Sequence, residues 1–104
     1  MTPAADAPPD LHQATLDTAT VEQLFRDIES CAHLTELIPK YAARGCVPQT
    51  ATLTFAEAQH LLLTRQLRAL QLRYRHDGAH WWDTLHALPE GFRLIRIRHE
   101  FPHE

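Results

Sequence analysis

Histidine is the residue type in this chain with the widest range of chemistry. Eight of the 104 residues are histidine, a side chain that binds transition metals and exchanges protons near neutral pH. The closest spacings are His76 to His80 and His99 to His103. A pair four residues apart binds one ion when both side chains share a helix face, but the first pair spans a predicted turn. We therefore expect dispersed, solvated histidines, with His99 and His103 as weak metal candidates.

The two cysteines, Cys31 and Cys46, are the candidate nucleophiles. A reactive thiolate needs a neighbouring base and a positive environment. Cys31 lies on the apolar stripe of a predicted helix, so we expect it in the core. Cys46 follows Gly45 in a predicted loop and is the better reactive candidate, although the sequence indicates no base beside it. Because no catalytic, nucleotide-binding or zinc motif accompanies them, we predict a non-enzymatic protein without a cofactor and with both thiols free.

Length and composition predict a single small domain. The chain has 104 residues, 44% of them apolar, which suits one modest hydrophobic core. No apolar stretch approaches the ~20 residues that a membrane-spanning helix needs, and the first residues lack the pattern of a secretory signal. The expected location is the cytoplasm, without membrane contact.

Helical periodicity and caps predict two helices. Residues 1–17 are rich in proline and aspartate and predict a flexible arm, followed by one domain over 18–104. Thr20 and Gln23 have the spacing of a capping box and predict a helix over about 20–33. Thr54 and Glu57 predict a second helix over about 54–66. Pro39 forbids a regular helix around itself, and residues 34–53 are left without an assignment.

From Ala69 onward the sequence alternates with a period of two, which predicts strands. Asp77-Gly78 favours a tight hairpin turn, and residues 88–91 supply a second turn. The predicted strands are 69–75, 80–87 and 92–101. The expected fold class is therefore α+β, with two helices packed on one face of a three-stranded antiparallel meander.

The hairpin register separates two adjacent tryptophans. A two-residue turn pairs Tyr74 with Trp81 and Arg73 with Trp82, so Trp81 faces the helices and Trp82 faces away from them. Asp83 falls on the same apolar face as Trp81. A carboxylate there is costly unless it is paired, so we expect Asp83 to lie near the sheet edge and to cap a helix or to meet an arginine.

The third strand completes the predicted outward face. A three-residue second turn would place Arg98 beside Trp82 and turn Ile95 and Ile97 inward. Tryptophan and arginine are enriched at the centres of protein interfaces. We predict a partner-binding face formed by Trp82, Arg73, Arg75, Arg96, Arg98 and His80.

The first hypothesis for function is an accessory or adaptor domain that docks on a larger protein, or on a second copy of itself, through this face. A second is a winged-helix-like nucleic-acid binder with helices at 36–44 and 55–66 and a wing at 69–86. The pI of about 6.2 is low for that class. A third is a small accessory protein that handles Ni, Zn or Cu through its histidines. The outward cations could also serve only to stabilise a solvated sheet.

Overall fold

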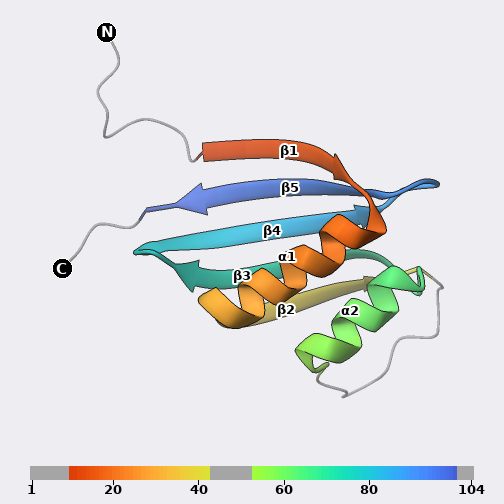
Figure 1. Cartoon of the computed structure of the whole chain (residues 1–104), viewed down its shortest axis with the longest axis horizontal. Helices are drawn as coiled ribbons and strands as arrows, with labels where there is room; N and C mark the ends of the chain where they lie inside the picture. Colours follow the sequence, from red (N-terminus) through yellow and green to blue (C-terminus); the bar gives the residue numbers. More distant parts are fainter. Residues whose placement is uncertain (1–9, 43–52, 101–104) are drawn as a thin grey trace, which may run out of the picture.

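A computed structural model describes residues 10–42 and 53–100, which form a five-stranded antiparallel sheet with two helices on one of its faces (Figure 1). The strands lie in the order β1-β5-β4-β3-β2. The elements in chain order are β1 (Asp10–Leu16), α1 (Thr18–Cys31), β2 (His33–Tyr41), α2 (Phe55–Leu63), β3 (Leu67–His76), β4 (Ala79–Ala87) and β5 (Phe92–His99).

The predicted three-stranded meander was wrong, because the sheet has a further strand at each edge. The α+β class and the antiparallel sheet are as expected, and the meander forms its centre as β3, β4 and β5. β1 comes from the segment that we predicted as a flexible arm, and its residues pair with β5 from Asp10 opposite Arg98 to Leu16 opposite Phe92. Residues 1–9 of that predicted arm lie outside the described part. Pairing with a distant strand supplies the hydrogen bonds that local composition did not predict.

β2 forms the other edge and contains Pro39. Proline cannot donate to a neighbouring strand, so it is tolerated at a sheet edge. Two register shifts interrupt the β2–β3 pairing, between Leu34 and Glu36 and between Lys40 and Tyr41. The winged-helix layout is therefore wrong, because it required a helix where β2 lies.

Each helix begins directly after a residue whose side chain caps its first turn. α2 has the predicted capping box: the Glu57 amide donates to Thr54 Oγ1 at 3.0 Å and the Thr54 amide donates to Glu57 Oε1 at 2.8 Å. In α1 the cap is Asp17, whose Oδ1 accepts from the Thr20 amide at 2.8 Å. The predicted cap at Thr20 was wrong, since an aspartate three residues earlier binds that amide.

The β3–β4 register confirms the predicted hairpin, with Tyr74 opposite Trp81 and Arg73 opposite Trp82. The turn has positive φ at both central positions, 55° at Asp77 and 79° at Gly78, as a type I′ hairpin requires. The two indoles therefore lie on opposite faces of the sheet.

The predicted alternation of β5 was wrong. Ala87 pairs with Phe92, so the β4–β5 turn has four residues, and the Leu88 amide donates to the Gly91 carbonyl at 3.0 Å. One extra turn residue moves every β5 side chain to the other face. Ile97 consequently lies opposite Trp82, whereas Arg96 lies opposite Asp83.

Both helices lie over one face of the sheet, which we call the helix-side face (Figure 1). The core consists of side chains between this face and the helices. Apolar side chains from both helices meet apolar side chains from the three central strands. The buried cluster contains Val21, Phe25, Ile28, Ala58, Leu62, Leu67, Leu70, Leu72, Tyr74, Leu85, Phe92 and Leu94.

Gly91 is the turn residue that the fold constrains most. Its φ is +79°, and a Cβ atom would lie 2.7 Å from the backbone oxygen of Leu16. We expect Gly91→Ala to lower the free energy of unfolding by about 2–3 kcal/mol, because left-handed strain and a backbone clash add. Gly78 has the same φ with nothing within 4 Å, so Gly78→Ala should cost only about 1–2 kcal/mol. Urea unfolding compares the two variants. Equal losses of unfolding free energy would show that the backbone at Leu16 moves away from the added Cβ at little cost in free energy.

Candidate functional site

The face of the sheet opposite the helices is the candidate site, and we call it the open face. Both helices lie on the other side, and no helix of the described residues crosses it (Figure 1). The alternation of the paired strands places these side chains on it: Glu36, Ile38 and Lys40 of β2, Gln71, Arg73 and Arg75 of β3, His80, Trp82, Thr84 and His86 of β4, and Arg93, Ile95, Ile97 and His99 of β5.

Trp82 lies at the centre of the open face and is held by its neighbours. The Arg73 guanidinium carbon lies 4.1 Å from the centroid of the indole ring, within cation–π range. The His99 ring centroid lies 4.4 Å from that of Trp82. Arg73 is held in turn, since its Nε donates to Gln71 Oε1 at 2.8 Å and its Nη1 lies 3.4 Å from Glu36 Oε1. The indole is thus half-buried, with Arg73 over one face of its ring.

A basic hollow lies beside Trp82 on the open face. Its volume is about 660 Å³, and Lys40, Arg68, Arg73 and His86 are among the side chains that line it. Arg68 reaches this side because the β2–β3 register shifts opposite it, between Lys40 and Tyr41, and a bulge redirects the extra residue. The hollow therefore presents several hydrogen-bond donors and positive charges to a ligand on this face.

The structure brings together four of the six predicted partner-binding residues. Trp82, Arg73, Arg75 and His80 lie on the open face. Arg96 and Arg98 lie on the helix-side face, because the four-residue turn reverses the alternation of β5. Those placements were wrong.

The open face also contains residues that sequence reasoning missed. Ile95 and Ile97 occupy the positions that the two arginines were expected to hold, opposite Thr84 and Trp82. Lys40 pairs with Ala69 and Arg68 is the extra residue at the β2–β3 register shift, and local sequence patterns did not predict this pairing. The open face is consequently more apolar at its centre than expected, and its described lysine and arginine residues lie on β2 and β3 apart from Arg93 of β5.

A buried polar triad lies behind Trp81 on the helix-side face. Asp83 is fully buried, with 0% exposure. Its carboxylate accepts hydrogen bonds from Arg96 Nε at 2.9 Å, Arg96 Nη2 at 2.8 Å and the Tyr74 hydroxyl at 2.8 Å. Of the two predicted partners, an arginine is confirmed, and it is Arg96. The predicted position near the sheet edge was wrong, because Asp83 lies on β4, the central strand. These charge-assisted bonds offset the cost of burying the carboxylate.

The triad couples stability to pH on the alkaline side. Burial, and then the charge of Asp83, raise the pKa of the Tyr74 hydroxyl well above its usual value of 10. The folded state therefore holds this proton more tightly than the unfolded state does, so its stabilising contribution is complete below about pH 10 and is lost as pH rises further. In Tyr74→Phe, we expect the free energy of unfolding to fall less steeply with pH between pH 9.5 and about 11 than in wild type. Urea unfolding at stepped pH measures it, and an unchanged slope would contradict the coupling.

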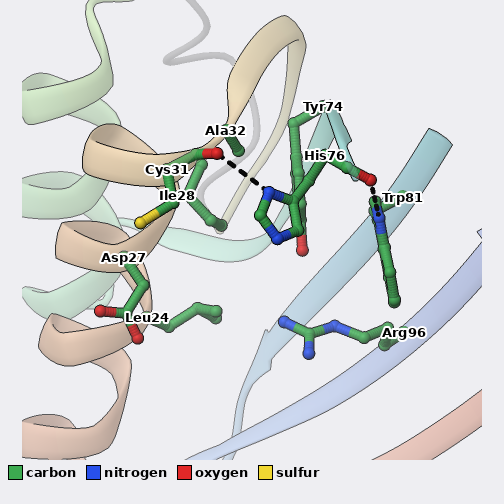
Figure 2. Close-up of a pocket in the computed structure, with 9 residues that line it drawn as sticks. All are labelled: Leu24, Asp27, Ile28, Cys31, Ala32, Tyr74, His76, Trp81 and Arg96. Atoms are coloured by element: carbon green, nitrogen blue, oxygen red, sulfur yellow. Dashed lines mark hydrogen bonds between the residues drawn. The ribbon is translucent and has the colours of Figure 1, made fainter. Parts of the chain in front are cut away.

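A pocket of about 350 Å³ lies on the helix-side face, between α1 and strands β3 to β5 (Figure 2). The residues that line it are Leu24, Asp27, Ile28, Cys31, Ala32, Tyr74, His76, Trp81 and Arg96. Figure 2 shows the Arg96 guanidinium and the Trp81 ring on the sheet side and Leu24 and Asp27 on the helix side.

Among the described residues, the candidate cysteine and histidine residues form neither a nucleophilic nor a metal-binding centre. Cys31 is exposed and free at the edge of this pocket, so its predicted core position was wrong. Cys46 and His103 lie outside the described residues. Within residues 10–42 and 53–100, no group of three or more His, Cys, Asp or Glu side chains could hold a metal ion.

Neither of the two helices that the structure describes combines the length and the apolar character that a membrane-spanning helix needs. Comparison of the chain with protein-family models, curated proteins and solved structures finds no match.

Proposed function

We propose that this chain is a non-enzymatic accessory domain that binds an acidic segment of a partner protein across its open face. The observation that carries the proposal is Trp82, stacked under Arg73 and flanked by Ile97 at the centre of a face without a covering helix among the described residues. Rigid aromatic and arginine side chains at the centre of a patch are the typical anchors of protein interfaces.

The charges of the open face favour an acidic partner over a second copy of the chain. Its described side chains include Lys40, Arg73, Arg75 and Arg93, with Arg68 at the basic hollow. The opposing acid among them is Glu36, which pairs with Arg73. Two copies placed face to face would bring these cations together, which is unfavourable once water is excluded.

A single-stranded nucleic acid is the competing occupant, because bases stack on exposed indoles and phosphates pair with arginine. The chain has a net charge of −3, and a strongly negative partner gains less long-range attraction from such a protein than from a basic one. An acidic protein segment needs only local complementarity at the face, and we therefore favour it.

Affinity capture with charge variants tests the proposal. Arg75 is exposed on the open face, and Arg26 is exposed on α1, on the helix side. We expect wild type and Arg26→Glu to retain the same acidic protein, and Arg75→Glu to lose most of it. Only Arg75→Glu places a negative charge on the open face, where it repels the acidic groups of the partner. Equal retention by all three would reject the open face as the binding surface.

The competing occupants have their own readouts. A protein that elutes as a dimer in wild type and as a monomer in Trp82→Ala would assign the face to self-association. Binding of oligo-dT or oligo-U that weakens steeply with salt would assign it to nucleic acid. Either result would replace the acidic-protein proposal.

A further inference from the structure

The pocket on the helix-side face is separate from the open face. It is bounded by α1 on one side and by Tyr74, Trp81 and Arg96 of the sheet on the other (Figure 2). Its apolar residues on the helix side are Leu24, Ile28 and Ala32. At about 350 Å³ it falls at the small end of the range for ligand pockets, enough for a one- or two-ring molecule.

Hydrogen bonds fix the aromatic side of this pocket. The Trp81 Nε1 donates to the His76 carbonyl oxygen at 3.0 Å. The Tyr74 hydroxyl is held by Asp83, and the Tyr74 and Trp81 rings are nearly parallel, 7° apart with centroids at 6.5 Å. A pocket whose rings are already fixed loses little conformational entropy when a flat ligand packs against it.

Arg96 gives the pocket one cationic end. Its guanidinium lines the pocket, whereas the Asp83 carboxylate that holds it is fully buried behind. Asp83 binds through Nε and Nη2, and a guanidinium has five N–H donors. The bidentate pair with Asp83 does not use Nη1 of Arg96. This pair orients the guanidinium, which keeps its two Nη1 donors for a ligand in the pocket.

Two other polar residues of the pocket, Asp27 and His76, already bind groups of the protein. Asp27 lies on the helix side, and its Oδ1 accepts a hydrogen bond from Gln23 Nε2 at 2.7 Å. His76 Nδ1 lies 2.9 Å from the Cys31 carbonyl oxygen. Because Asp27 adds a negative charge at the edge, the pocket favours a ligand with one anionic group over a ligand with several.

We infer that this pocket binds a small planar apolar acid, with its ring against Trp81 and its single carboxylate on the Arg96 guanidinium. The inference does not depend on the open face or on a protein partner. An arginine held by a buried carboxylate is a preorganised donor for a planar carboxylate. The apolar residues of α1 cover the other side of the ring.

The test is an NMR titration of the full chain with 2-naphthoate and with its neutral amide, 2-naphthamide. We expect 2-naphthoate to shift the Trp81 indole N–H saturably, with a Kd below about 1 mM for a ligand of this size. The amide should bind at least about tenfold more weakly, because it lacks the charge that pairs with Arg96. No saturable shift, or equal binding by acid and amide, would overturn the inference.

Pocket-filling variants provide the matched controls. Ala32→Leu and Leu24→Phe each add bulk to the helix side of the pocket. Each of these variants that keeps the wild-type near-UV CD spectrum should bind 2-naphthoate at least about tenfold more weakly. Trp82→Ala changes only the open face and should leave the Kd within about twofold. Unchanged binding in both filled variants would place the acid elsewhere and overturn the inference.

Discussion

Asp83→Asn is expected to lower the free energy of unfolding by about 2–4 kcal/mol. Asp83 is fully buried, and its carboxylate accepts the hydrogen bonds of Arg96 and Tyr74. Removing one member of a buried ion pair leaves the other charge without compensation. The loss lies toward the lower end for such pairs because the Arg96 side chain keeps 29% exposure, so water partly solvates it. Urea unfolding at pH 7 measures the change.

The control for Asp83 is an exposed carboxylate that also pairs with an arginine. Glu36 lies 3.4 Å from Arg73 Nη1 and its side chain is 55% exposed. Glu36→Gln should change the stability by less than about 1 kcal/mol, because solvent screens such pairs. A double variant, Asp83→Asn with Arg96→Gln, should recover part of the loss by removing the uncompensated charge. Equal losses in the Asp83 and Glu36 variants would contradict the buried triad.

Trp82→Ala should weaken binding of the captured partner by about 30-fold or more, which corresponds to about 2 kcal/mol. The indole is half-buried between Arg73, Ile97 and His99, so the partner buries its remaining face and loses that contact in the variant. Calorimetric titration of the purified partner measures the affinity. The far-UV CD spectrum of the variant should match wild type, since the core lies on the other side of the sheet.

Trp81→Phe is the matched control for Trp82→Ala. Trp81 lies on the helix-side face, and its hydrogen bond to His76 is lost in this variant. It should therefore reduce stability by about 1 kcal/mol and leave the partner affinity within about threefold. The proposal fails if Trp81→Phe abolishes partner binding and Trp82→Ala does not.

Local patterns predicted the elements whose determinants are close in sequence. Alternation around Tyr74 and the Asp77-Gly78 turn gave the β3–β4 register and the opposite faces of the two indoles. The Thr54 and Glu57 capping box gave the start of α2. In each case the atoms that decide the structure lie within a few residues of one another.

The remaining parts depend on distant residues or on a single loop residue. β1 is a strand because β5, about 80 residues later, offers its edge, and its own composition gives no such signal. The placement of Arg96 and Arg98 depended on a turn of three or four residues, and the four-residue turn reversed it. Asp83 on the apolar face was a clue, since a buried carboxylate opposite β5 requires a cation there.

The most direct test of the open face is the isoleucine methyl spectrum of the chain with and without its captured partner. The sequence has four isoleucines: Ile38, Ile95 and Ile97 lie on the open face, and Ile28 lies in the core under α1. We predict that the partner shifts or broadens the δ1-methyl signals of the first three and leaves that of Ile28 unchanged. A shift confined to Ile28, with the other three unaffected, would contradict the proposal.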